Sequence, residues 1–310
     1  MDNFKHYSVM LNEAVDALQC KNGKIYVDCT LGGGGHSELI LKRIQPDGKL
    51  ISFDIDDEAI EHSKERLKSY NNLTIIKSSY VNIKSELKKL NIDRITGGVI
   101  LDLGASYHQL TKPERGFSFL KDAPLDMRFD TKADFTAYDV INGYKEDDLV
   151  RIFSEYGEER FSKRIAKKIV EVRKLSPIRT TKELADIIIN CTPSVKSHIH
   201  PATRVFQAVR IEVNGELENI KSVLNDIIDV LDAGAYISVI SFHSLEDRIV
   251  KQIFKHESSK CRCNNMICTC TPPKIELVNK KPITASEAEL SENPPSRSAK
   301  LRVVKCINIC

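Results

Sequence analysis

Short apolar runs alternate with amphipathic segments over the first hundred positions of the chain. Four of these runs have the length of buried strands, at residues 25–27, 50–53, 74–76 and 98–103. The segments 58–70 and 83–90, which lie between them, carry apolar residues at helical spacing among charged ones. Strands separated by helices predict a parallel sheet with crossover helices, and therefore an α/β fold.

The alternation stops after the fourth run. Little periodicity is present from 108 to 144, and helical patterns then follow at 145–156, 158–175, 181–191 and 201–231. The next strand pattern, 235–241, comes only after about 130 residues. We therefore expect a helical domain inserted between the fourth and fifth strands. The sheet domain is placed at 1–108 and 210–310, and the inserted domain at 109–209.

A run of four glycines, residues 32–35, follows the first predicted strand. Asp54 ends the second strand, 22 residues after Gly32. This order of strand, glycine loop, helix, strand and acid is typical of a Rossmann-like adenosine site. Glu38 stands where a dinucleotide fingerprint has its third glycine, and Asp28 before the loop would repel a pyrophosphate. S-adenosylmethionine has a cationic headgroup and no phosphate, so it suits this acid better than a dinucleotide.

Composition excludes several classes of protein. With 310 residues, 41% hydrophobic and 29% charged, the chain has enough apolar residues for one large or two ordinary soluble domains. No apolar stretch approaches the roughly 20 residues of a membrane span, and the first residues lack a signal-peptide core. Nine cysteines without an export signal predict reduced thiols and a cytoplasmic protein. The net charge of +3 does not by itself indicate a nucleic-acid partner.

Seven longer motifs begin at the end of the fourth strand. They are DLGASYHQL at 102–110, ERGFSF at 114–119, PLDMR at 124–128, YGEERF at 156–161, HPATRVFQA at 200–208, SFHSLEDR at 241–248 and SAKLR at 298–302. In this order they resemble the RsmH (MraW) family, whose members use S-adenosylmethionine to methylate N4 of a cytidine in bacterial 16S ribosomal RNA. The resemblance runs essentially from end to end of the chain.

The resemblance implies a class I methyltransferase sheet with an inserted RNA-recognition domain. It also implies cofactor contacts at the matching positions, which are Gly34, Gly35, His36, Asp54, Tyr80, Asp102 and Gln109. Tyr80 stands where the family usually has phenylalanine, and either ring can stack on adenine. Residues 105–108 read Ala-Ser-Tyr-His where the family usually has Val-Ser-Ser-Pro. The length of this segment is unchanged, so Gln109 keeps its place, but the loop conformation need not be the same.

Asp102 is the candidate catalytic residue. Methyl transfer from a sulfonium requires alignment more than acid–base chemistry. Cytosine N4 is a poor nucleophile because its lone pair is delocalised into the ring, so an acceptor for its hydrogens would help. Asp102 ends a buried strand, and open α/β folds bind ligands at the carboxyl ends of their strands. The alternative interpretation of Asp102 is a surface or helix-capping acid.

The predicted insertion contains a dense basic segment. Between 160 and 182 there are nine Lys or Arg residues and one acid, Glu171. On a helix, Arg160, Arg164, Lys167 and Lys168 share one face. This stripe is a candidate phosphate-binding surface, and an ordinary solvated helix face is the alternative. The expected partner is 16S rRNA in the small ribosomal subunit, with no membrane, and a homodimer stays open.

Four cysteines lie close together near the C-terminus, at Cys261, Cys263, Cys268 and Cys270. Four thiolates can form a structural zinc site, but paired cysteines one residue apart are tighter than the common ligand spacing. Reduced, unligated thiols are the favoured interpretation, and we expect no metal elsewhere. Two other functional classes remain: a nicotinamide-dependent dehydrogenase, which cofactor binding would reveal, and a non-enzymatic RNA-binding protein, which would tolerate loss of Asp54 and Asp102.

Overall fold

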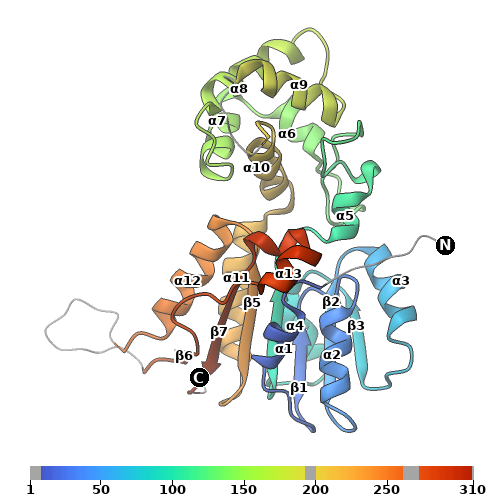
Figure 1. The fold of residues 1–310 in the computed structure, drawn as a ribbon, viewed down its shortest axis with the longest axis vertical. Coiled ribbons are helices and arrows are strands. Elements are labelled where there is room, and N and C mark those ends of the chain that lie inside the picture. The colour runs from blue at the N-terminus through green and yellow to red at the C-terminus, as the bar shows by residue number, and fades with distance from the viewer. Residues whose placement is uncertain (1–7, 193–199, 261–271, 309–310) are drawn as a thin grey trace, which may run out of the picture. The chain divides into compact units, whose positions relative to one another are not determined.

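The computed structural model describes residues 8–192, 200–260 and 272–308. The chain forms two compact units (Figure 1). The first contains Met1–Gly104 and Leu217–Cys310, and the second contains Ala105–Glu216. The four cysteines weighed as zinc ligands, Cys261 to Cys270, lie outside the described residues.

The first unit is built on a seven-stranded sheet with the order β3-β2-β1-β4-β5-β7-β6. The strands are β1 (Ile25–Asp28), β2 (Lys49–Asp54), β3 (Leu73–Lys77), β4 (Gly98–Asp102), β5 (Tyr236–Ser241), β6 (Ile275–Leu277) and β7 (Lys300–Cys306). The first five are parallel, whereas β7 runs antiparallel to both β5 and β6. The predicted α/β fold with a Rossmann-like sheet is confirmed, and β6 and β7 extend it beyond the five predicted strands.

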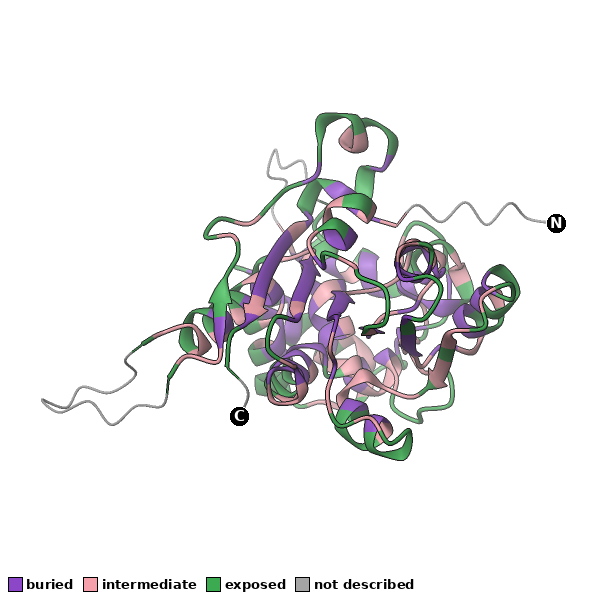
Figure 2. Cartoon of the chain, turned by 90° about the horizontal axis from the view of Figure 1, so that it is seen from below, coloured by how far each residue is buried: buried purple, intermediate pink, exposed green. Residues whose placement is uncertain are grey.

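Helices cover both faces of this sheet. They are α1 (Leu11–Asp16), α2 (Gly35–Arg43), α3 (Asp57–Arg66), α4 (Ile83–Lys89), α11 (Glu216–Val230), α12 (Ser244–Glu257) and α13 (Glu287–Glu292). Along β4, Val99 and Leu101 enter a core shared with α4, α11 and α12, while Ile100 enters a core shared with α1 and α2. The central strands are therefore buried on both sides (Figure 2), as expected for a parallel sheet between helices, whereas the edge strands β3 and β6 are more exposed.

The second unit is helical and has its own apolar core. Its helices are α5 (Tyr107–Thr111), α6 (Ala137–Gly143), α7 (Glu146–Glu155), α8 (Ser162–Arg173), α9 (Thr181–Cys191) and α10 (Thr203–Asn214). Phe153, Ile165 and Ile188 are fully buried in this core. In the chain, this helical unit lies between β4 and β5. No helix in the described part of the chain has the length and apolar character needed to cross a membrane.

Two predicted helix boundaries are wrong. The single helix predicted at 201–231 is broken at Gly215, whose φ of 60° is left-handed, so that α10 ends there and α11 begins at Glu216. Glycine adopts this conformation without the steric cost other residues bear. The helix predicted from 158 begins at Ser162 instead, because Glu158 has a φ of 49°.

Candidate functional site at the glycine loop and the carboxyl edge of the sheet

The glycine loop connects β1 to the first turn of α2. Gly32 and Gly34 have φ angles of 49° and 77°, which are left-handed. Gly34 is the N-cap of α2, and no side chain caps this helix end. The first backbone amides of a helix lack partners within the helix, and with the helix dipole they favour an anionic group. The loop therefore offers backbone donors suited to a carboxylate.

Two side chains of helix α3 donate hydrogen bonds to the glycine loop. Ser63 Oγ donates a hydrogen bond of 2.8 Å to the carbonyl of Gly32, and Arg66 Nη1 donates one of 2.8 Å to the carbonyl of Gly33. A Cβ added to Gly34 would lie 3.0 Å from Ser63 Oγ and 3.3 Å from Leu67 Cδ1. Gly34 is therefore required for both its backbone angle and its close approach to α3.

Replacing Gly34 with Ala is expected to lower the free energy of unfolding by about 1–3 kcal/mol, since a left-handed non-glycine residue costs energy and α3 leaves little room. The measurement is urea unfolding followed by circular dichroism. Gly143→Ala is the control, because a Cβ there meets nothing within 4 Å. Equal stability of the Gly34 variant and the wild type would contradict this account of the loop.

Asp54 fixes the loop from the end of β2. Its Oδ2 accepts a hydrogen bond of 2.8 Å from the amide of Gly32, and its Oδ1 accepts bonds of 2.8 and 2.9 Å from Ile55 and Asp56. Burial raises the pKa of the Asp54 carboxyl, although these hydrogen bonds oppose the shift. The acid predicted at this offset lies at the loop, and its carboxylate orientation is set by three backbone donors.

Asp28 lies beneath the loop and is only 1% exposed. Its Oδ2 accepts a hydrogen bond of 2.7 Å from Ser37 Oγ, and its Oδ1 accepts one of 3.0 Å from the amide of Thr30. Burial raises the pKa of Asp28 to about 6, against the lowering effect of these bonds. Asp28 thus supports the residues on both sides of the glycines.

Asp102 ends β4, and its backbone amide donates a hydrogen bond of 2.7 Å to Thr30 Oγ1. Its Oδ1 is buried and has no hydrogen-bond partner among the described residues. Its Oδ2 lies 3.8 Å from Nδ1 of His36. Burial, reinforced by the negative charges of Asp28 and Glu246, raises the pKa of Asp102 well above its usual value. An unsatisfied buried acceptor of this kind is costly unless a ligand supplies the donor.

His36 joins Asp102 to the N-terminal segment. Its ring is 4% exposed, and its Nε2 lies 3.1 Å from the carbonyl oxygen of Val9. A carbonyl can only accept, so Nε2 carries a proton in this arrangement and Nδ1 faces Asp102. The ring of His36 therefore sets the environment of the acid beside it.

Of the three remaining predicted residues, Gly35 is the first residue of α2, and Tyr80 and Gln109 lie in different units of the chain. Tyr80 begins the short 3₁₀ helix Tyr80–Asn82 after β3, and it packs half-buried against the first core. Gln109 belongs to the second unit, where its backbone amide donates to Ser106 Oγ and its Oε1 accepts from the amide of Ser106. This capping box fixes Gln109 at the start of α5.

The geometry of the first unit brings three acids to the carboxyl ends of three adjacent strands. Asp54, Asp28 and Asp102 end β2, β1 and β4, which are neighbours in the sheet. No Lys or Arg pairs with any of these acids in the described residues. The uncompensated negative charge favours a cationic ligand at this edge. Sequence reasoning missed Thr30 and Ser37, although hydroxyl residues on both sides of the glycines were the available signal.

Part of the basic segment 160–182 lies on helix α8, with its cations on one side of the helix as the helical pattern predicts. On α8, Lys163, Arg164, Lys167 and Lys168 are exposed, while Ile165 and Ile169 on the opposite side are buried. Arg173 differs, because its guanidinium donates hydrogen bonds to the carbonyls of Ile141 and Tyr144. The exposed side of α8 therefore carries cations, whereas Arg173 stabilises the helical unit.

Comparisons with known proteins show the family to which the chain belongs. The family model described as the MraW methylase family matches residues 3–307. The ribosomal RNA small subunit methyltransferase H of Clostridium botulinum (strain Loch Maree / Type A3) is 49% identical over 308 residues, covering 98% of this chain and 99% of that protein. The protein of the same name from Caldicellulosiruptor saccharolyticus is 50% identical over 307 residues, covering 98% of this chain and 100% of that protein.

Two solved structures align over nearly the whole chain. A putative rRNA-methylase from Clostridium thermocellum has a TM-score of 0.47 at 13% identity and covers 98% of this chain and 99% of its own. A putative methyltransferase from Streptococcus mutans in complex with SAH has a TM-score of 0.43 at 10% identity, with coverage of 97% and 99%. On the match of the family model and the identity to curated relatives, this chain belongs to the MraW methylase family.

Proposed function

We propose that this protein transfers a methyl group from S-adenosylmethionine to N4 of a cytidine in the decoding region of 16S rRNA, in the small ribosomal subunit. The observation that carries the proposal is a set of three acids beside a glycine loop, Asp28, Asp54 and Asp102, none of which pairs with a Lys or Arg in the described residues. Relatives named as ribosomal RNA small subunit methyltransferases support the choice of substrate. The reaction would take place in the cytoplasm, where small subunits are assembled.

The cofactor contacts that we propose are Gly34, Gly35, His36, Asp54, Tyr80, Asp102 and Gln109. The amides at the start of α2 would bind the carboxylate of the amino-acid part, since no side chain caps that helix end. Asp54 would accept from the ribose hydroxyls, because a carboxylate has capacity beyond its three backbone donors. Tyr80 would stack on the adenine.

The charge at the sheet edge distinguishes this cofactor from a dinucleotide. A pyrophosphate would lie against Asp28, Asp54 and Asp102, and no basic side chain pairs with them in the described residues. The ammonium and sulfonium groups of S-adenosylmethionine would instead be attracted to these acids. The negative charge at these acids therefore disfavours the dinucleotide cofactor of a dehydrogenase.

In the reaction, the bound cofactor supplies a methyl group on an electron-poor sulfonium. Asp102 would then act on the target base, because its buried Oδ1 is an acceptor without a partner in the described residues. Accepting a hydrogen bond from N4 would localise the nitrogen lone pair, and the carboxylate would stabilise the positive charge that develops there. A raised pKa makes Asp102 a better base for the proton that N4 must lose.

RNA recognition is assigned to the inserted domain, which we propose at 109–209. The exposed cations of α8, Lys163, Arg164, Lys167 and Lys168, would bind phosphates without reading sequence. The target cytidine must be unstacked for its N4 to reach a buried site, as for other enzymes that act on bases.

Cofactor affinity is expected to fall at acidic pH. The pKa of Asp28 is about 6, so this acid is charged at pH 7.5 and mostly neutral at pH 5. If a cationic ligand binds best to the charged form, affinity should be about tenfold weaker at pH 5 than at pH 7.5. Isothermal titration calorimetry with S-adenosylmethionine measures this. A flat profile across this range would contradict the proposed attraction between Asp28 and the cofactor.

The test of the proposed substrate uses S-adenosylmethionine with a labelled methyl group. The protein is incubated separately with unmodified small subunits and with large subunits, and the label in each RNA is counted. We expect label in small-subunit RNA alone. Label in neither RNA, together with undetectable cofactor binding, would overturn the proposal.

A further inference from the structure

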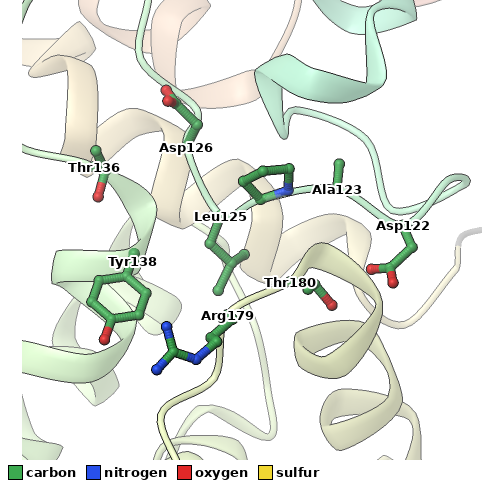
Figure 3. Close-up of a pocket in the computed structure, with 9 residues that line it drawn as sticks. Asp122, Ala123, Leu125, Asp126, Thr136, Tyr138, Arg179 and Thr180 are labelled. Carbon is green, nitrogen blue, oxygen red and sulfur yellow. The ribbon is translucent and has the colours of Figure 1, made fainter.

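A pocket of about 610 Å³ lies within the second unit (Figure 3). It is lined by the segment 122–126, by the start of α6 and by the connection between α8 and α9, including Asp122, Leu125, Asp126, Tyr138, Arg179 and Thr180. Ligand sites for small molecules have volumes of about 300–1,000 Å³. This pocket is therefore large enough for one nucleotide.

Backbone hydrogen bonds hold the three segments around the pocket. The amide of Leu125 donates 3.1 Å to the carbonyl of Arg179, and the amide of Tyr138 donates 2.8 Å to the carbonyl of Leu125. Pro124 and Thr180 also form an isolated antiparallel bridge. Because the walls are tied to one another, the pocket is formed before any ligand enters, which reduces the entropic cost of binding.

The side chains at the pocket combine an aromatic ring with a cation. The ring of Tyr138 is half-buried and packs against the helical core. Arg179 is exposed, and no described carboxylate pairs with its guanidinium. In Figure 3 this guanidinium extends toward the Tyr138 ring. A fixed ring beside a cation suits a flat base attached to a phosphate.

The acids at the pocket leave the arginine available. Asp126 is neutralised by Arg128, which donates to its Oδ1 at 2.9 Å and to its Oδ2 at 2.5 Å. Asp122 is exposed and projects on the other side of the pocket in Figure 3, away from Arg179. A phosphate at Arg179 would therefore meet a cation without an adjacent uncompensated acid.

We propose that this pocket binds one unstacked nucleotide of the RNA substrate at a position other than the methylated cytidine. The base stacks on Tyr138, and the phosphate contacts Arg179. Arg179 also follows the cations of α8 in the sequence, so the pocket continues the basic segment with a base-binding element. The inference rests on the proposed RNA substrate, and it adds a second point at which that RNA is held.

The test is photo-cross-linking of the full-length protein to a short single-stranded pyrimidine RNA that carries 5-iodouridine. The cross-linked peptide is identified by mass spectrometry, and affinity is measured by fluorescence anisotropy. We expect a cross-link at Tyr138. Tyr138→Leu and Arg179→Gln should each weaken RNA binding at least about fivefold, and Arg179→Gln should reduce the slope of log affinity against log salt by about 0.7.

Two control variants show whether a loss of RNA affinity comes from the pocket or from any change to this unit. Tyr138→Phe keeps the ring and should bind RNA within about twofold of the wild type. Lys145→Gln removes an exposed cation of the same unit that does not line the pocket, and it should have the same small effect. Thermal melting identifies any variant that has lost its fold. If Tyr138→Leu or Arg179→Gln is unfolded, the affinity of Tyr138→Phe and the position of the cross-link still test the proposal.

The inference is overturned if the cross-link maps elsewhere, or if Arg179→Gln binds RNA as tightly as Lys145→Gln. Binding of a ribosomal protein rather than RNA by these residues would also overturn it. If Tyr138 cross-links to RNA but unmodified small subunits accept no methyl group, then the proposed function fails while the pocket assignment stands.

Discussion

Replacing Asp102 with Asn is expected to lower the rate of methyl transfer at saturating S-adenosylmethionine by about 100- to 1,000-fold, the range seen when a preorganised electrostatic group is removed. Asn keeps the shape of Asp but lacks the negative charge and cannot take up a proton. The substitution removes the negative charge at the buried Oδ1, which has no hydrogen-bond partner in the described residues. Single-turnover kinetics with labelled cofactor measures the chemical step.

Asp93→Asn is the matched control for this experiment, because Asp93 is an exposed acid before β4 and is not one of the proposed site residues. Its rate should equal that of the wild type. Calorimetry on the Asp102 variant separates weaker cofactor binding from slower chemistry. A normal single-turnover rate for Asp102→Asn would exclude Asp102 as the catalytic acceptor.

Replacing Asp54 with Ala is expected to weaken S-adenosylmethionine binding by about 10- to 100-fold, since hydrogen bonds to a charged group contribute about 1.5–3 kcal/mol. The variant loses the proposed contacts to the ribose and also the bond that ties Gly32 to β2. The dissociation constant is measured by calorimetry at a temperature where the variant is folded. Asp54→Glu, which keeps the charge, should recover part of the affinity.

Asp47→Ala is the control for the Asp54 experiment, because Asp47 is an exposed acid whose side chain accepts a hydrogen bond from Asn22 and is not part of the proposed site. It should leave cofactor affinity unchanged. An Asp54→Ala variant that binds S-adenosylmethionine within twofold of the wild type would contradict the assigned role of this acid.

The sequence was sufficient for the parts of the fold that depend on local patterns. The apolar runs at 25–27, 50–53 and 98–103 correspond to β1, β2 and β4, since buried parallel strands are continuous apolar segments. The spacing from the glycine loop predicted Asp54 as an acid at the cofactor site; the structure shows it bonded to Gly32, and its contact with a ribose stays a prediction. These features succeed because strand, loop and acid are close in sequence.

Features that depend on distant parts of the chain could not be predicted in this way. β7 pairs antiparallel with β5, and 58 residues separate the end of β5 from the start of β7; only the first residues of Lys300–Cys306 belong to a family motif. The break at Gly215 was also missed, because one glycine inside a helical pattern costs only about 1 kcal/mol and does not by itself predict an end.

The role of Asp28 shows the same limit at the site. Its position before the glycines indicated an acid near the ligand, but burial and hydrogen bonds to Thr30 and Ser37 are properties of the folded chain. The capping box that holds Gln109 likewise depends on the conformation of Ser106, which the residue pattern alone did not specify. Residue identity gave the candidates, and the structure gave their geometry.

The most direct test of the central claim is to identify the nucleoside that receives the methyl group. Unmodified small subunits are treated with the protein and labelled S-adenosylmethionine, and the RNA is digested to nucleosides and separated by liquid chromatography with mass spectrometry. We predict that the label is in N4-methylcytidine from the decoding region of 16S rRNA, and that it appears about 100- to 1,000-fold more slowly with Asp102→Asn. Label in any other nucleoside would contradict the proposed reaction.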